Sequence, residues 1–159
     1  MHIKFLQIIV SSKTRRIHPD IAVAFNKELD TRKKRKLPIY DILSSMLLPA
    51  LDKVARKIGS AQTAVDHARI ACHLELHKLK HKKYPAKLAD LESPLPMDLY
   101  NGKPYVYKPN PKGRYQLYGV GWNQKDDGGR VVLLDNGRLN HKAGDLVWRY
   151  SPRPAPKEK

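Results

Sequence analysis

Three carboxylates and one side-chain amide lie close together in the C-terminal third of the chain, where a loop is expected. They are Asn123, Asp126, Asp127 and Asp145. If the loop folds back on itself, the four side chains meet, and oxygen donors of this kind suit a hard cation better than a substrate. The same residues also fit a tight turn, because Asp side chains readily accept hydrogen bonds from nearby backbone amides. Both interpretations stay open at this point.

Three histidines recur at every fourth position, which places their imidazoles along one face of a helix. They are His73, His77 and His81. Two histidines at this spacing can hold zinc, but no third ligand is obvious, so we interpret all three as solvated polar positions. No nucleophile and base pair and no phosphate-binding loop stand out. We therefore expect a protein that is not an enzyme; Asp126, Asp127 and the histidines would be the only catalytic candidates.

The chain is strongly basic, with 31 Lys and Arg against 15 Asp and Glu and a formal net charge of +16. Such an excess attracts polyanions, but it is spread along the chain, which argues against specific nucleic-acid binding. One run is concentrated: Arg32, Lys33, Lys34, Arg35 and Lys36. A solvated linker is the simpler interpretation of this run. The alternative is a basic module that binds nucleic acid or anionic surfaces through residues 32–36 and 80–83.

A long helix is predicted over residues 46–83. Its apolar positions follow steps of three and four: Leu47, Leu51, Val54, Ile58, Ala61, Val65, Ala68, Cys72, Leu76 and Leu79. This spacing predicts a continuous apolar seam, interrupted by Gly59, which costs roughly 1 kcal/mol relative to Ala in a helix. Cys72 lies in the seam and is expected to be a buried thiol. A helix of about 50 Å is longer than such a domain needs, so part of it should pack against another element or chain.

The remaining elements place this helix between an arm and a small sheet. Residues 1–45 form an N-terminal arm with one short helix and the basic linker. Strands are expected at 105–108, 114–120, 131–134 and 146–150, within an antiparallel sheet region at 103–150. Residues 151–159 are rich in Pro and charge and should be disordered. The fold class is therefore α+β, with a long helix as a spine whose seam packs on the sheet.

Four segments, taken in order, resemble the C-terminal region of type II secretion major pseudopilins. They are YPAKLADLE after the helix, LPMDLYNGKPYVY, GRYQLYGVGWNQKDDGG and GDLVW. The double aspartate and double glycine after the tryptophan are similar to pseudopilin-like domains embedded in uncharacterised bacterial proteins. The resemblance covers residues 47–150, about two-thirds of the chain.

The resemblance implies a pilin-like fold, no catalysis, and a calcium ion that stabilises the loop between the last strands. Asn123 takes the place of the family's loop aspartate, and Asp145 that of the aspartate before the terminal strand. Asp126 and Asp127 lie where further ligands would come from, with the carbonyls of Tyr118 and Val120 as backbone ligands. Asn123 removes one formal charge from this set, and the interval from Gly128 to Gly144 is longer than the family loop.

The resemblance also implies partners and a location. We expect other protein subunits or domains, including other copies of the chain, to pack against the long helix, in an extracytoplasmic or envelope-associated setting. A pseudopilin begins with a processed leader and an apolar helical stretch bearing a glutamate, and this sequence shows neither. It also contains no run of about 20 apolar residues that would span a bilayer. We therefore expect either a fragment of a longer protein or a domain reused without a fibre.

Overall fold

The computed structural model describes residues 10–11, 15–33, 39–110 and 114–148, and it describes the side chains of the long helix from Ala50 onward. The predicted tail at 151–159, the first residues of the predicted arm and positions 34–36 of the basic run lie outside these ranges. No helix in the described residues has a stretch long and apolar enough to cross a bilayer.

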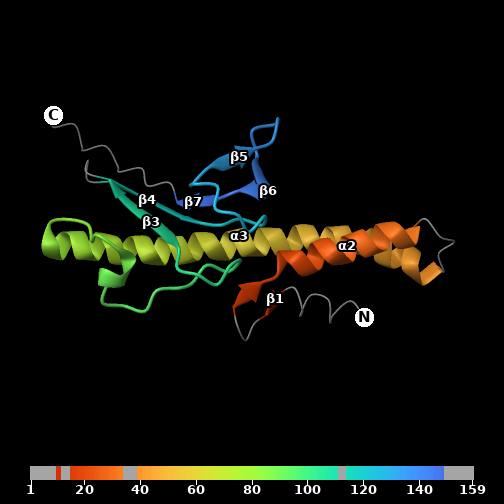
Figure 1. Ribbon diagram of the computed structural model, residues 1–159, viewed down its shortest axis with the longest axis horizontal. Helices are drawn as coiled ribbons and strands as arrows, with labels where there is room; N and C mark the ends of the chain where they lie inside the picture. The colour runs from red at the N-terminus through yellow and green to blue at the C-terminus, as the bar shows by residue number, and fades with distance from the viewer. Residues whose placement is uncertain (1–9, 12–14, 34–38, 111–113, 149–159) are drawn as a thin grey trace, which may run out of the picture.

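Two helices form the scaffold of the molecule. The short helix α2 spans Pro19–Lys33, with Asp20 in its first turn, where a negative charge interacts favourably with the helix dipole. The long helix α3 spans Ile39–His81. It begins before the predicted residue 46, so Pro49 lies inside the helix, and it ends close to the predicted residue 83. Figure 1 shows α2 lying alongside the N-terminal half of α3.

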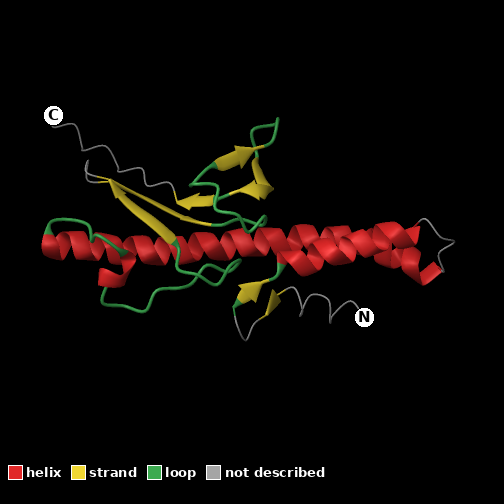
Figure 2. Ribbon diagram, viewed as in Figure 1, coloured by secondary structure: helices red, strands yellow, loops and turns green. Residues whose placement is uncertain are grey.

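Short antiparallel sheets lie along α3, two of them on one side and the third on the other (Figure 2). A three-stranded sheet has the order β3-β4-β7, formed by Val106–Asn110, Arg114–Gly119 and Leu146–Trp148. A second sheet pairs β5, Val131–Leu133, with β6, Leu139–Gly144. A third pairs β1, Val10–Ser11, with β2, Arg16–Ile17. The predicted α+β class is confirmed at this level. The strand β6 was not predicted from the sequence, and a short strand within residues 1–17 was only one of two interpretations.

The segment between α3 and β3 crosses to the opposite side of the long helix (Figure 1). It contains the single-turn helix η1, Leu88–Asp90. Its residues Leu99 and Tyr100 join Ile17, Ala55 and Trp122 in one core cluster. A second cluster is formed by Ile70 and Leu74 of α3 with Tyr105, Tyr115 and Leu117. Both clusters use the same face of α3, so that face organises the fold.

The predicted seam is not the face that packs on the sheet, and this expectation is wrong. Val54, Ile58, Val65, Leu76 and Leu79 are between 47% and 70% exposed. Cys72, predicted to be buried, is also exposed. The exception is Leu51, which is half-buried and packs against the first cluster. We call the set Val54, Ile58, Ala61, Val65, Ala68, Cys72, Leu76 and Leu79 the apolar stripe.

Between Asp52 and His67 the buried face of α3 carries mainly small and polar residues, and only beyond them does it carry the large apolar residues Ile70 and Leu74. Ala55, Thr63 and His67 are each no more than 2% exposed, and Asp52 and Arg56 form an ion pair one turn apart. A side chain at Gly59 would overlap the Tyr100 hydroxyl and the Ile17 side chain. This face is therefore selected for close approach of the surrounding chain rather than for apolar volume, which explains why hydrophobic periodicity pointed to the other side.

Candidate functional site

The carboxylate of Asp145 holds the predicted cation loop in place. Asp145 is 1% exposed. Its Oδ2 accepts the backbone N–H of Gly129 at 2.7 Å, and its Oδ1 accepts that of Asp127 at 3.3 Å. Its own N–H donates to the carbonyl of Arg130 at 2.8 Å. Asp145 therefore fastens residues 127–130 to the start of β7.

The other three predicted ligands lie in the same loop. Asp126 Oδ1 accepts the Tyr118 hydroxyl at 3.1 Å and the Gly128 N–H at 2.9 Å. Asn123 Nδ2 donates to Asp127 Oδ2 at 2.8 Å, and Asn123 Oδ1 accepts the Lys125 N–H at 3.2 Å. The structure brings all four residues together. Their side-chain oxygens accept nearby backbone N–H groups, which is the pattern expected of a tight turn.

The donor set fits a calcium ion in part. Both oxygens of Asp145 already accept backbone N–H groups, so an ion would draw on the exposed carboxylates of Asp126 and Asp127. In the described ranges, no three His, Cys, Asp or Glu side chains form a cluster that could hold a metal. Calcium at this loop stays a prediction, derived from the resemblance.

Asp98 is a structural carboxylate that the sequence analysis did not single out. It is 2% exposed, and burial raises its pKa to about 6. Its Oδ1 accepts the Tyr100 N–H at 2.9 Å, and its Oδ2 accepts the Val120 N–H at 2.8 Å. The available signal was its place just before the Asn101-Gly102 turn, where an Asp side chain often caps the backbone two residues on.

Asp66 and Arg69 are three positions apart in α3, a spacing that suits a surface ion pair, but the two side chains have other partners. Asp66 is buried and accepts hydrogen bonds from the Tyr105 hydroxyl at 3.2 Å and from Gln62 Nε2 at 3.1 Å. The Arg69 guanidinium donates to the carbonyl of Pro94 at 3.4 Å. Burial, together with the nearby Asp66 charge, raises the pKa of Tyr105 well above its usual range.

His67 lies next to this group. It is 2% exposed, and burial lowers its pKa to about 4, so its imidazole is neutral at pH 7. The ring packs edge-on against Tyr105, with 4.7 Å between centroids. Its Nε2 is buried without a hydrogen-bond partner. The sequence analysis did not consider His67, because a lone histidine within a helical pattern gives no signal of burial.

The three histidines of the predicted helical face lie near the end of α3. The rings of His77 and His81 are 4.3 Å apart, and His77 Nδ1 lies 3.1 Å from the Lys83 carbonyl oxygen. His73 and His77 are half-buried, and His81 is exposed. These contacts agree with polar surface positions.

The basic residues of the alternative hypothesis occupy two places. Arg32 and Lys33 end α2; their side chains and residues 34–36 lie outside the described ranges. Lys80 pairs with Glu92 at 3.1 Å, and Lys82 and Lys83 are exposed just after α3. The run precedes the start of α3 and the lysines follow its end, so the two groups are separated by a helix of about 60 Å. Within the part of the chain that the structure describes, the end of α2 at Arg32 and Lys33 is therefore far from Lys80, Lys82 and Lys83.

The remaining surface feature is the apolar stripe, which follows α3 on the side opposite the core clusters. At its C-terminal end the stripe residue Leu76 lies beside His73, His77 and His81, and the rest of the stripe is apolar, so its chemistry is mainly that of packing. Compared with family models, curated proteins and solved structures, the chain has no match in any of the three.

Proposed function

We propose that this chain is a non-catalytic assembly domain, resembling the head of a type II secretion pseudopilin, that packs through α3 against a second copy of itself. The observation that carries the proposal is the exposed apolar stripe. Its large members, Val54, Ile58, Val65, Leu76 and Leu79, are about half exposed or more. Contiguous apolar surface of this kind on a protein usually marks an interaction site.

The spacing of the stripe suits a helical partner. From Leu51 to Cys72 the apolar positions alternate in steps of three and four, which is the heptad period of two helices wound around each other. The stripe runs for about 38 Å along α3. A second α3 offers an equally long apolar surface with the same period, so two copies can cover each other's stripe.

The order of the elements after α3 supports the resemblance to a pseudopilin. A long helix precedes a small antiparallel sheet, and the last strand, β7, directly follows the Asp145 loop. This order is the one that the resemblance implies. Assembly in an extracytoplasmic or envelope setting belongs to the same proposal.

Charge should control the strength of self-association. A chain with a formal net charge of +16 repels its own copies, and dissolved salt screens that repulsion. Apolar contact between the stripes is not weakened by moderate salt. Self-association should therefore strengthen as ionic strength rises, which distinguishes it from aggregation driven by opposite charges.

The test is sedimentation velocity over a range of protein and salt concentrations. The double variant Ile58→Asp and Val65→Asp places two charges in the middle of the stripe and should give monomers, with an unchanged helical circular dichroism spectrum. The matched control is Val23→Asp and Met97→Asp, because both residues are comparably exposed but lie on α2 and in the segment between α3 and β3. The control should associate like the unaltered chain. A chain that stays monomeric at all concentrations, or a stripe variant that associates normally, would overturn the proposal.

The alternative function is a basic module, favoured by the exposure of Lys82 and Lys83 beyond the end of α3. It predicts binding to anionic vesicles or nucleic acid that weakens steeply as salt rises. This is the opposite salt dependence from self-association, so one salt series separates the two. Replacing Lys82 and Lys83 with Gln should weaken such binding and leave sedimentation unchanged.

A further inference from the structure

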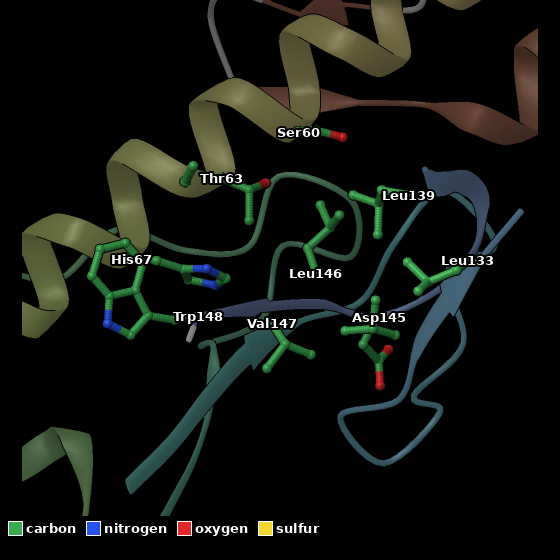
Figure 3. Close-up of a pocket in the computed structure, with 11 residues that line it drawn as sticks. Ser60, Thr63, His67, Leu133, Leu139, Asp145, Leu146, Val147 and Trp148 are labelled. Carbon is green, nitrogen blue, oxygen red and sulfur yellow. The ribbon is translucent and has the colours of Figure 1, made fainter. Parts of the chain in front are cut away.

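A cavity of about 350 Å³ lies between α3 and the strands β6 and β7. Its strand side is apolar and includes Leu133, Leu139, Leu146 and Trp148. Figure 3 shows the side chain of Leu146 on the side of β7 that faces α3, with the side chains of Val147 and Asp145 on the other side. A cavity of this size falls in the range of small-molecule sites.

The α3 side of the cavity is polar. Thr63 and His67 line it from successive turns of the helix, and in Figure 3 the His67 ring extends from α3 toward Leu146. Both residues are at least 98% buried. His67 Nε2 has no hydrogen-bond partner, and Thr63 Oγ1 makes no hydrogen bond of ordinary geometry. A buried polar group without a partner costs free energy, and a ligand with a matching group would remove that cost.

The charged groups near the cavity are already satisfied. Both oxygens of Asp145 accept backbone N–H groups on the far side of β7. The Ser60 hydroxyl, on the same helix, lies 3.0 Å from His141 Nδ1. Burial keeps the His67 imidazole neutral at pH 7, since its pKa is lowered to about 4. The polar group that the cavity offers to a ligand is therefore an uncharged hydrogen-bonding group.

From these contacts we infer that the cavity is a binding site for a small uncharged molecule with an apolar ring or chain and one hydroxyl or carbonyl group, which hydrogen-bonds to His67 Nε2. The apolar body lies against Leu139 and Leu146, and the oxygen-bearing end lies at His67 and Thr63. This site is separate from the apolar stripe and does not depend on the proposed assembly function.

Two probes that differ by one hydroxyl test the inference. 2-Naphthol and naphthalene have nearly the same apolar body, and binding is followed by two-dimensional NMR of the labelled 159-residue chain. We expect 2-naphthol to shift the signals of His67, Thr63 and Leu146, and naphthalene to bind at the same place several-fold more weakly. The difference reflects the hydrogen bond that only 2-naphthol makes.

Two variants separate the polar from the apolar contribution. His67→Leu removes the hydrogen-bonding group while keeping a side chain of similar size, so the preference for 2-naphthol should disappear and naphthalene should still bind. Ala64→Phe should block both probes, because Ala64 lines the cavity and is itself exposed, so a larger side chain is accommodated without disrupting the core. The matched control is Ala61→Phe, on the apolar stripe of the same helix, which should leave binding unchanged.

The inference is overturned if 2-naphthol up to its solubility limit leaves the cavity signals unchanged, which would make the cavity a site for ordered water only. It is equally overturned if the shifts centre on Val54, Ile58 and Val65, since the probe would then bind the apolar stripe. Equal binding to Ala64→Phe and to the unaltered chain is the third contradicting result.

Discussion

The carboxylate of Asp98 accepts the backbone N–H of Val120 at 2.8 Å, across 22 positions of the chain. This bond fixes the segment before β3 against the residue that follows β4. The other oxygen of Asp98 accepts the Tyr100 N–H at 2.9 Å. One buried side chain thus joins the crossing segment to the main sheet.

Replacing Asp98 with Ala should destabilise the protein strongly, because two buried backbone N–H groups lose their acceptors. At about 1–3 kcal/mol for each unsatisfied group, the free energy of unfolding should fall by about 2–6 kcal/mol. Urea denaturation measures this change. Asp98→Asn keeps the shape and one acceptor oxygen and should cost less than Ala. Equal stability of Asp98→Ala and the unaltered chain would show that the bond is not structural.

Stability should depend on pH through Asp98. Its pKa is raised from the usual 3.8 to about 6 by burial, so the folded state binds more protons than the unfolded state between these values. The contribution of Asp98 to the free energy of unfolding is therefore largest at low pH. It falls by about 3 kcal/mol as pH rises from about 4 to 6. NMR titration of the Asp98 carboxyl carbon gives the folded pKa directly.

His67 should change the pH dependence of stability in the opposite direction. Its pKa is lowered from 6.5 to about 4 by burial, so the unfolded state binds more protons between these values. Stability from His67 is therefore present above pH 6.5 and lost as pH falls toward 4, again by about 3 kcal/mol. Because the two effects largely offset each other, the unaltered chain should show a shallow pH profile.

Single variants should reveal both effects by urea denaturation at a series of pH values. In His67→Leu the Asp98 effect remains, so stability should fall between pH 4 and 6. In Asp98→Asn the His67 effect remains, so stability should rise between pH 4 and 6.5. Parallel profiles for the two variants would contradict the burial of one or both groups.

Gly59→Ala should destabilise the protein, although alanine is the better helix former. A Cβ at this position would overlap the Tyr100 hydroxyl and the Ile17 side chain. Overpacking of this kind costs typically about 1–3 kcal/mol, more than the roughly 1 kcal/mol gained in helix propensity. In the double variant with Tyr100→Phe the hydroxyl is gone, so the loss on thermal unfolding should be smaller than for Gly59→Ala in the unaltered background. A rise in melting temperature for Gly59→Ala alone would contradict the close packing.

Calcium should raise the melting temperature of the metal-stripped chain if the Asp145 loop binds it, because a ligand that binds only the folded state stabilises that state. Thermal unfolding with millimolar calcium, and with magnesium as the control, measures the shift. Asp126→Asn with Asp127→Asn should abolish a calcium response while preserving the Asp145 hydrogen bonds to the backbone. No shift in the unaltered chain would show that the loop is a turn held by its hydrogen bonds without an ion.

The periodic parts of the fold were predictable from the sequence. The apolar spacing predicted α3, and the alternating residues around Tyr115 and Leu117 predicted the β3–β4 hairpin, which the structure confirms. The short helix at Ile21 is also confirmed. In each case the pattern lies within one segment, and local geometry alone determines which residues share a face.

The packing of those parts was not predictable in the same way. A row of apolar residues along a helix predicts that this face packs against something, but it does not identify the partner. Val65 and Leu76 were therefore wrongly predicted to pack on the sheet. The residues that do pack, such as Gly59, Thr63 and His67, look unfavourable for a core when considered singly. The roles of Asp98 and Asp66 depend on partners 22 and 39 positions away, which no local pattern records.

The two faces of α3 should differ in the kinds of mutation that the fold tolerates. Substitutions on the apolar stripe do not disturb the core clusters, since Val65 and Ile70 point to opposite sides of the helix and only Ile70 is buried. Insertion or deletion of one residue is different, because it rotates everything beyond it by about 100°. Such a change between Ala55 and Leu74 would rotate one core cluster of α3 relative to the other, so the helix could not pack against both parts of the fold. The core clusters therefore place no constraint on the stripe, which only the proposed self-association would constrain, whereas the length of α3 between Ala55 and Leu74 is fixed by the fold.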